Sequence, residues 1–336
     1  MKEYFKIIKK FSIGRIINVI NLYTSFMISR LLKLEKHWGV PYAISIEPTT
    51  SCNLACPECP SGLKSFSRET GNLSIELNKQ IVDSFSNKLM YINYYFQGEP
   101  YINKNFLEFI KYAKSKNIYC STSTNAHFLN DETSKKTVQS GLNRLIISID
   151  GTSQETYQDY RINGELSKVI EGTKNIMKWK KELNSNTPTV IFQFLVTRKN
   201  EHQIDEIKKM GSELGVDEIK LKTIQVYDYK NGNKLIPINE KHSRYKLNKN
   251  GTYSIKNKFY NNCWRMWSSC VITVDGTIVP CCFDKDAKYT MGNIKIKDFN
   301  KIWKGSDYKK FRQNILSDRK NIDICRNCSE GSKVWT

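Results

Sequence analysis

The chain has 336 residues, of which 39% are hydrophobic and 12% aromatic, and this composition supports a folded core and excludes an intrinsically disordered protein. Its 53 Lys and Arg residues against 33 Asp and Glu residues give a net charge of +20, which favours anionic partners. The cations are spread along the whole chain without an Arg-rich block among aromatic residues, so nucleic-acid binding is not expected.

Residues 1–40 are predicted to form an N-terminal helical extension. The uncharged stretch 16–29 is shorter than the about 20 residues that cross a bilayer, and basic residues flank it. Two interpretations stay open. The helix packs on the body of the protein, which we favour, or it makes peripheral contact with a membrane surface as an amphipathic helix.

The ten cysteines are interpreted together with the cellular compartment. The basic N-terminus has no small-residue cleavage site after an apolar run, so no secretory signal is predicted and a cytoplasmic location is expected. Because thiols stay reduced there, the cysteines are expected to be ligands or nucleophiles rather than disulfides.

Residues 41–230 alternate short apolar runs with helical periodicity. The runs that predict strands are 42–48, 91–96, 118–122, 145–149, 190–196 and 219–224. The helical stripes are Leu77, Ile81 and Phe85; Phe106, Phe109, Ile110 and Ala113, with Asn103 as N-cap; Val169, Thr173, Ile176 and Leu183; and Ile204, Ile207, Met210 and Leu214. This alternation predicts an α/β fold with a parallel sheet. Six strands are too few for a closed barrel of eight, so we expect a partial (β/α)6 TIM-like barrel.

Polar residues follow the predicted strands at their carboxyl ends, where parallel sheets gather their chemistry. The first strand is followed by a Cys-x3-Cys-x2-Cys loop formed by Cys52, Cys56 and Cys59. Structural zinc and ordinary iron–sulfur carriers take four ligands. Three thiols therefore favour a cubane cluster held at three irons with the fourth left open for a substrate. A zinc site with a distant fourth ligand is the alternative.

The segment CNLACPEC after SIEPT resembles the signature of radical S-adenosylmethionine (SAM) enzymes, and the resemblance covers residues 43–336. It implies a [4Fe–4S] cluster on the three cysteines, SAM on the open iron, and reductive cleavage of SAM to a 5′-deoxyadenosyl radical that abstracts hydrogen from the substrate. The residue before the last cysteine, usually hydrophobic in this family, is Glu58.

The resemblance also implies SAM-binding residues, namely Gly98 and Glu99 in QGEP, Ser123, Thr124 and Asn125 in STN, Ser148 and Asp150 in SID, and Arg161 for the SAM carboxylate. Each group also has a plainer interpretation. Glu99 could be a solvated loop carboxylate, Asp150 could belong to a turn with Gly151, and Thr124 with Asn125 could cap the next helix.

A second cysteine group lies in residues 231–336, which are predicted to form a small C-terminal domain of a β-hairpin plus a helix. The hairpin is expected to turn at the two residues Asp275 and Gly276. Cys263, Cys281, Cys325 and Cys328 make a closed set of four thiols, in which Cys270 or Cys282 could replace Cys281. Their spacing resembles the SPASM and Twitch domains of radical SAM enzymes, and that of enzymes like 2-deoxy-scyllo-inosamine dehydrogenase. The resemblance implies an auxiliary [4Fe–4S] cluster, with zinc as the rival. Cys120 lies within a predicted strand and is expected to be a buried filler.

Three functions follow from these features. A cluster without an open iron should accept an electron, so the leading hypothesis is a radical SAM oxidoreductase of the dehydrogenase type that acts on a small polar substrate such as a sugar or cyclitol. The alternatives are a radical SAM maturase that modifies a peptide or protein, and a non-catalytic iron–sulfur protein that relays electrons. The positive charge suits an acidic reductant such as flavodoxin or ferredoxin. The sequence names neither the substrate, nor the catalytic base, nor the oligomeric state.

Overall fold

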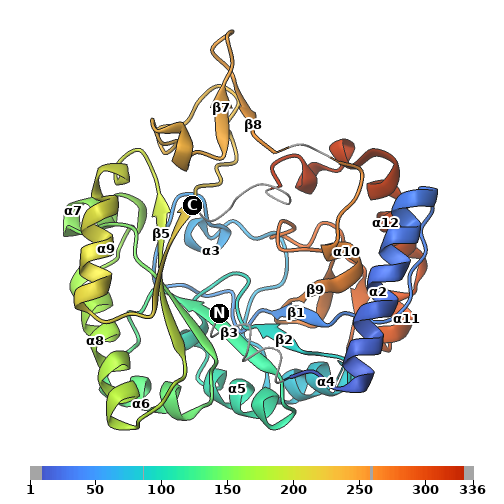
Figure 1. Cartoon of the computed structure of the whole chain (residues 1–336), viewed down its shortest axis with the longest axis horizontal. Helices are drawn as coiled ribbons and strands as arrows, with labels where there is room; N and C mark the ends of the chain where they lie inside the picture. The colour runs from blue at the N-terminus through green and yellow to red at the C-terminus, as the bar shows by residue number, and fades with distance from the viewer. Residues whose placement is uncertain (1–9, 86, 258–259, 329–336) are drawn as a thin grey trace. The chain divides into compact units, whose positions relative to one another are not determined.

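The computed structural model describes residues 10–85, 87–257 and 260–328 (Figure 1). Residues 1–9 of the predicted N-terminal extension and 329–336 of the predicted C-terminal domain lie outside these ranges. The chain forms two compact units. The first takes the described residues within 1–51, 66–122 and 259–326, and the second those within 52–65, 123–258 and 327–336. The boundaries predicted near residues 40 and 230 stay predictions.

The first unit is built on a sheet whose strands follow the order β11-β10-β9-β1-β2-β3. These strands are β1 (Ala43–Ile46), β2 (Tyr91–Asn93), β3 (Tyr119–Thr124, which ends in the second unit), β9 (Ser269–Ile272), β10 (Thr277–Val279) and β11 (Gly292–Asn293). Strands β1, β2 and β3 are parallel, as predicted. The C-terminal hairpin extends the same sheet, because β9 pairs in parallel with β1.

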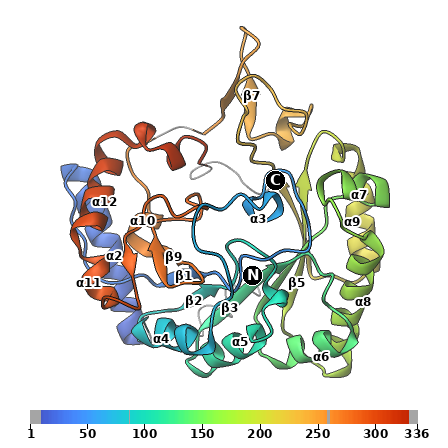
Figure 2. The ribbon, with the colours of Figure 1, turned by 180° about the vertical axis from the view of Figure 1, so that it is seen from behind.

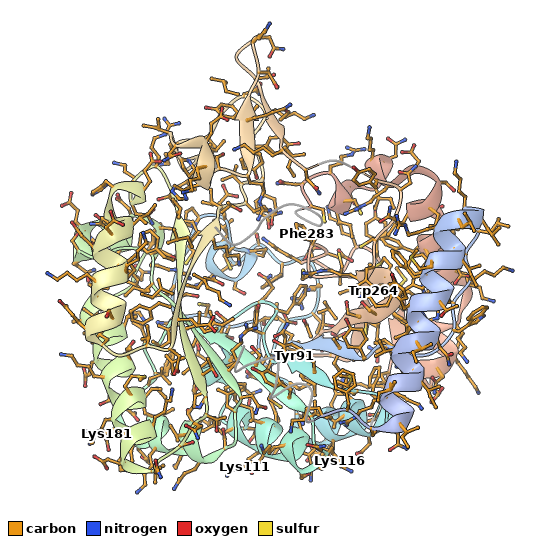
Figure 3. All side chains as sticks on the ribbon, in the orientation of Figure 1. Tyr91, Lys111, Lys116, Lys181, Trp264 and Phe283 are labelled. Carbon is orange, nitrogen blue, oxygen red and sulfur yellow. The ribbon has the colours of Figure 1, made fainter. Side chains whose placement is uncertain are left out.

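Helices of the first unit pack around this sheet, and in α4 and α5 the buried face is the apolar stripe that the periodicity predicts. They are α2 (Ile13–Leu32), α4 (Ile75–Phe85), α5 (Phe106–Ser115), α10 (Arg265–Ser268), α11 (Phe299–Trp303) and α12 (Ser306–Asp318), with short 3-10 turns η1 (Pro100–Ile102), η4 (Arg319–Asn321) and η5 (Asp323–Cys325). Both views place α2 beside α10 and α12 (Figures 1 and 2). Trp264, labelled in Figure 3, packs against α2, with 5.3 Å between its ring and that of Phe26.

The second unit contains the parallel strands β4 (Arg144–Ser148), β5 (Thr189–Val196) and β6 (Glu218–Thr223). Its helices are α3 (Pro60–Leu63), α6 (Asp131–Gln139), α7 (Gln154–Tyr160), α8 (Leu166–Glu182) and α9 (Ile204–Glu213), with η2 (Glu201–Gln203) and η3 (Glu240–His242). A separate ribbon pairs β7 (Tyr245–Leu247) with β8 (Tyr253–Ile255). The strand–helix alternation confirms the predicted α/β class with a partial TIM-like barrel and a C-terminal hairpin plus helix.

Three local predictions are wrong. The N-cap of α5 is Asn105; Asn103 lies two residues earlier, where its Oδ1 accepts from the Asn105 amide (2.9 Å) and its Nδ2 donates to the carbonyls of Pro48 (2.7 Å) and Leu73 (3.0 Å). Leu183 ends α8 with its side chain 38% exposed, outside the buried stripe.

The hairpin loop is the third. It has three residues rather than two, since the Thr273 amide donates to the Thr277 carbonyl at 3.0 Å and Gly276 adopts a φ of +89°. A left-handed glycine at the third position is the usual way to close such a loop.

No helix among the described residues has the length and apolar character needed to traverse a bilayer. The predicted N-terminal helix is present as α2, capped at its start by Ser12 and at its end by Lys33 with a φ of +54°.

Candidate functional site

The three-cysteine loop lies in the second unit, where it packs on an apolar cluster. Cys56 is buried beside Leu54 in this cluster, and Cys52 and Cys59 pack against it half-buried. Helix α3 begins directly after Cys59 and folds back on the loop. A Cβ at Gly62 would come within 2.5 Å of the Cys56 amide, so only glycine fits this close approach.

Polar groups of the second unit face the sulfurs. The Leu54 amide lies 3.4 Å from Cys52 Sγ, and Asn125 Nδ2 lies 3.9 Å from the same sulfur. Arg161 Nη1 lies 3.8 Å from Cys56 Sγ. Donors aimed at sulfur stabilise thiolates and the anionic clusters that they hold.

Arg161 is fixed by a buried carboxylate. Its Nε donates to Asp150 Oδ2 at 2.5 Å, while Asp150 Oδ1 accepts from the Leu195 amide at 2.7 Å. Burial lowers the pKa of Arg161, but the charges of Asp150 and Cys56 outweigh it and hold that pKa well above its ordinary value. The guanidinium therefore remains a permanent cation beside the loop.

Asn125 connects the loop to the end of β3. Its Nδ2 donates to Asn53 Oδ1 at 2.8 Å, and its Oδ1 accepts from the His127 amide at 3.1 Å. His127 Nε2 accepts from the Glu165 amide at 2.9 Å, which leaves Nδ1 to donate to the Asn125 carbonyl at 3.0 Å. Burial lowers the pKa of His127, consistent with this neutral form.

The other predicted SAM-binding residues at the ends of β3 and β4 lie next to Asn125 or in contact with one another. Ser123 Oγ is 3.3 Å from Ser148 Oγ, so the ends of β3 and β4 meet here. Thr124 Oγ1 accepts from the Ala126 amide at 3.0 Å. The cap interpretation of Thr124 and Asn125 is wrong, because Asn130 caps α6.

Gly98 and Glu99 belong to the first unit, beside the residues that precede the cysteine loop. Gly98 has a φ of +72°, and a Cβ there would lie 2.3 Å from the Thr49 carbonyl, so both backbone angle and space require glycine. The Glu99 amide donates to the carbonyl of Ser51, the residue before Cys52, at 2.8 Å. Glu99 is 2% exposed, so it is no solvated loop carboxylate, and it caps η1 by accepting from the Tyr101 amide.

Glu58, the departure from the family pattern, has a structural partner within the second unit. Its Oε2 accepts from the amide of Tyr227 at 2.9 Å, beyond the end of β6. The carboxylate therefore holds a neighbouring loop in place, a contact that a hydrophobic residue cannot make.

The C-terminal cysteines form a second concentration of thiols. In the first unit, burial raises the pKa of Cys281 well above its ordinary value, and Cys282, Cys263 and Cys325 add to the increase because they lie close to it. Cys328 follows Cys325 by three residues and belongs to the second unit, where its carbonyl accepts from Asn257 Nδ2 at 3.1 Å.

The other cysteines have different surroundings. Cys270 is buried in β9, where burial raises the pKa of its thiol, and its neighbours are Tyr308 and Arg312. Cys282 Sγ lies 3.4 Å from Arg265 Nη1. Cys120 is fully buried in β3, and burial raises the pKa of its thiol to about 12, as an apolar filler requires.

Within the described ranges, no three His, Cys, Asp or Glu side chains surround a position for a single metal ion. A cubane cluster is larger than one ion and takes each thiolate at a different corner, so its ligands stand farther apart. The donor set fits such a cluster at the first group: three thiols on one loop, an apolar floor, N–H groups directed at sulfur and an adjacent cation.

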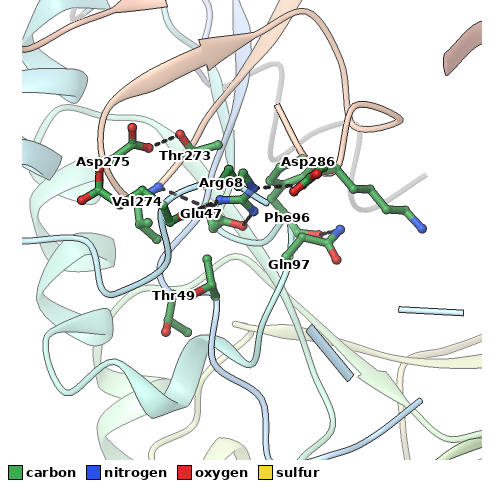
Figure 4. A network of polar contacts seen from close by, with 12 residues as sticks. Glu47, Thr49, Arg68, Phe96, Gln97, Thr273, Val274, Asp275 and Asp286 are labelled. Atoms are coloured by element: carbon green, nitrogen blue, oxygen red, sulfur yellow. Dashed lines mark hydrogen bonds and ion pairs between the residues drawn. The ribbon is translucent and has the colours of Figure 1, made fainter. Parts of the chain in front are cut away.

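The sequence prediction missed a network of polar contacts, centred on the buried Glu47, that joins the segments before and after the cysteine loop (Figure 4). Within the first unit, Glu47 and Arg68 form a two-pronged ion pair at 2.6 and 2.8 Å, and the Val274 amide donates to Glu47 at 3.3 Å. Ser67 binds Asp286 through its amide at 2.8 Å. Residues just before and just after the loop are thereby tied to the C-terminal hairpin and the segment that follows it. The only sign of this network in the sequence was the acidic residue Glu47 in the SIEPT segment, and nothing in the sequence indicated Arg68 as its partner.

Family models match two parts of the chain. Residues 46–212 match the radical SAM superfamily, and residues 263–329 match the SPASM iron–sulfur cluster-binding domain.

Curated relatives are similar at low identity. The tungsten-containing aldehyde ferredoxin oxidoreductase cofactor-modifying protein of Pyrococcus furiosus is 26% identical, over 84% of this chain and 86% of that protein. The mycofactocin maturase MftC of Mycolicibacterium smegmatis is 27% identical over 54% of this chain, and the PqqA peptide cyclase of Bradyrhizobium diazoefficiens is 25% identical over 63%. This chain spans only about half the length of the latter two, 45% and 54%.

Solved structures share the fold. BtrN in complex with AdoMet and 2-DOIA superposes with a TM-score of 0.52 and 18% identity, over 87% of this chain and 94% of that chain. The enzyme anSMEcpe with bound AdoMet gives 0.63 at 16% identity, over 87% and 92%. SuiB of Streptococcus suis bound to S-adenosylmethionine gives 0.63 at 15% identity, over 92% and 76%.

Proposed function

Because this chain belongs to the radical SAM superfamily and carries a SPASM-type iron–sulfur domain, we propose that it oxidises a bound substrate by two electrons, as a radical SAM oxidoreductase of the dehydrogenase type. The two domains bind a [4Fe–4S] cluster with SAM and an auxiliary cluster. When bound, these cofactors supply a 5′-deoxyadenosyl radical from one-electron cleavage of SAM, which takes a hydrogen atom from the substrate, and an acceptor for the substrate's second electron as its proton leaves.

Cys52, Cys56 and Cys59 would hold the first cluster. Cys52 and Cys59 are half-buried, which suits access of SAM to the cluster, and the apolar cluster on which the loop packs would limit access of water. Arg161 would remain beside Cys56 as a permanent cation, which compensates thiolate charge and can attract the SAM carboxylate. Asn125 would orient Cys52 through its Nδ2.

Two further groups would bind SAM. The turn at Gly98 and Glu99 presents backbone close to the residue that precedes Cys52, which suits a contact with the methionine amino group. Ser123, Thr124, Ser148 and Asp150 lie at the ends of β3 and β4 in the unit that holds the cysteine loop, which suits contacts with the ribose and methionine.

Cys263, Cys281, Cys325 and Cys328 would hold the auxiliary cluster. The proximity of Cys263 and Cys325 to Cys281 supports this set. The surroundings of Cys270, against Tyr308 and Arg312, argue against that residue as a ligand. A closed set of four thiolates offers no open iron, so its role would be to accept the electron.

One observation carries the proposal: the chain holds three cysteines on one loop, and a second concentration of thiols in which Cys282, Cys263 and Cys325 lie close to Cys281. An open cluster initiates chemistry, and a closed one stores or moves charge, so the pair suits a net oxidation. A peptide substrate is the second candidate, supported by the similarity to MftC and to the PqqA peptide cyclase. The charge of +20 supports an acidic reductant such as flavodoxin or ferredoxin.

The test is anoxic reconstitution of the full chain followed by iron counting and SAM cleavage. We expect about eight irons per chain and formation of 5′-deoxyadenosine with dithionite and SAM. Deuterated cyclitols and deuterated peptides are then offered in separate reactions, and deuterium in 5′-deoxyadenosine identifies the substrate class. Intact clusters without any 5′-deoxyadenosine would establish an electron-relay protein instead.

A further inference from the structure

Helix α2 turns its apolar side outward. Ile13, Ile17, Ile20 and Leu31 are 79%, 51%, 56% and 82% exposed, and Tyr23 and Met27 continue the same stripe. More than half of the exposed large hydrophobic side chains in the described residues fall between 11 and 38. With a rise of about 1.5 Å per residue, the stripe from Ile13 to Leu31 is about 27 Å long. An exposed apolar face of this extent marks an interaction site.

The buried side of α2 is largely polar, and this fixes the orientation of the helix. Asn18 exchanges two hydrogen bonds with the Val40 backbone, at 2.8 and 3.0 Å. Arg15 donates to the Lys10 carbonyl at 2.7 Å, and Ser29 donates to the Lys36 carbonyl at 2.8 Å. A rotation that buried the apolar stripe would break these bonds and expose Leu22 and Phe26, so the outward stripe is the orientation that the side chains specify.

Cations stand at both ends of the stripe. Lys88 Nζ donates to the carbonyl of Gly14 at 3.1 Å, near the start of α2. Arg30, Lys33 and Lys36 are exposed near its end. The sequence has no Asp or Glu between residues 4 and 34, and Glu35 pairs inward with Arg312 at 3.3 Å. Trp38 at 45% and Phe11 at 42% exposure add aromatic rings at either end, of the type that favours the membrane interface.

We propose that α2 docks parallel to the surface of a bilayer that contains anionic lipids, with its apolar stripe in the headgroup region. This surface is separate from the proposed oxidation and does not depend on it. Interfacial helices of this kind combine an apolar face with flanking Lys and Arg residues, and anionic headgroups neutralise those cations. A second copy of the chain fits less well, because antiparallel pairing of two α2 stripes adds no acidic partner for Arg30, Lys33 or Lys36.

The test is co-flotation of the full reconstituted protein with vesicles of phosphatidylcholine alone or mixed with phosphatidylglycerol. We expect binding to the mixed vesicles and about tenfold weaker binding to phosphatidylcholine. The triple variant Ile13→Gln/Ile20→Gln/Leu31→Gln should lose about tenfold or more of the binding. Glutamine keeps the helix propensity and these positions are exposed, so the fold should persist.

Two matched controls distinguish binding through α2 from non-specific hydrophobic or electrostatic binding to the vesicles. Ile238→Gln/Leu247→Gln/Ile296→Gln removes three equally exposed apolar side chains elsewhere and should bind as the wild type does. Lys33→Glu/Lys36→Glu should weaken binding about tenfold, whereas Lys104→Glu/Lys209→Glu, with the same change in net charge, should not.

The proposal would be overturned if the wild-type protein did not bind the mixed vesicles, or if the α2 triple variant still bound them. It would also be overturned if sedimentation equilibrium showed a dimer of the wild-type protein and a monomer of this variant. The last result would assign the stripe to self-association.

Discussion

The two cysteine groups differ in what surrounds the sulfur atoms. At the three-cysteine loop, an amide, Asn125 and the Arg161 cation lie within 3.9 Å of sulfur. At the second group, Cys281 is half-buried close to Cys282, Cys263 and Cys325, and desolvation together with those thiols raises its pKa. Burial also raises the pKa of Cys56, so both groups favour a metal cluster that takes the thiolates, and they differ in the donors directed at the first group's sulfurs. The difference fits the proposed division between a cluster that initiates the chemistry and a cluster that accepts an electron.

The largest expected effect comes from removing one ligand of each group. Cys56→Ala should abolish SAM cleavage, by about a thousandfold or more, because the reactive centre loses one of its three anchors. The auxiliary cluster should remain, visible as about four irons per chain.

Cys325→Ala should give the opposite pattern, with SAM cleavage retained and substrate oxidation lost. Chromatography of 5′-deoxyadenosine and iron analysis measure both, and Cys120→Ala serves as the buried control that alters neither. If Cys56→Ala still cleaves SAM, the assignment of the first group is wrong.

Arg161→Met tests the cation beside Cys56 in the first group. Loss of this charge should slow SAM cleavage about 10- to 100-fold and shift the first cluster to a more negative potential, while the second cluster keeps its own. The measurements are initial rates and anoxic redox titrations.

Arg161→Lys should restore part of the rate, because it keeps the charge without the fork that binds Asp150. The exposed Arg198→Met is the matched control and should behave as the wild type. An unchanged potential in Arg161→Met would reduce Arg161 to a purely structural role.

Acid should lower the free energy of unfolding through one histidine in each unit, and this effect should be smaller than those of the preceding substitutions. His37, in the first unit, contacts the Trp267 carbonyl at 3.2 Å. Burial, aided by Arg312, lowers its pKa from 6.5 to about 2. The unfolded chain therefore binds a proton below pH 6.5 that the folded chain does not, so stability is full above pH 6.5 and falls as the pH decreases.

Between pH 7 and 5.5, the free energy of unfolding should fall by about 1 kcal/mol through His37, measured by denaturant titration under anoxic conditions. His37→Gln should remove this slope. His127→Gln, next to Asn125, should remove a smaller one, since burial lowers that pKa less completely. An unaltered slope in His37→Gln would show that another group controls the acid response.

Local signals in the sequence determined most of the fold. Each predicted strand appears within a few residues of its expected ends, because the apolar runs are short, rich in β-branched and aromatic residues, and bounded by turn residues. The three cysteines and the positions that follow β3 and β4 were also readable, since carboxyl ends of parallel strands converge by topology. The position of Asn103 was not predicted because its Nδ2 binds the Pro48 and Leu73 carbonyls, which are distant in the sequence, while α5 begins two residues later at the Asn105 cap.

The sequence by itself determined the thiol counts, the strand–helix alternation and the family. Only the tertiary structure decided which face of α2 is outward, which residues hold Arg161, and that β9 joins β1. These outcomes depend on pairings between residues far apart in the chain. A buried polar group such as Asn18, Asp150 or Glu47 binds whichever partner folding brings within hydrogen-bond distance. The hydrophobic periodicity of the sequence does not predict which partner that is.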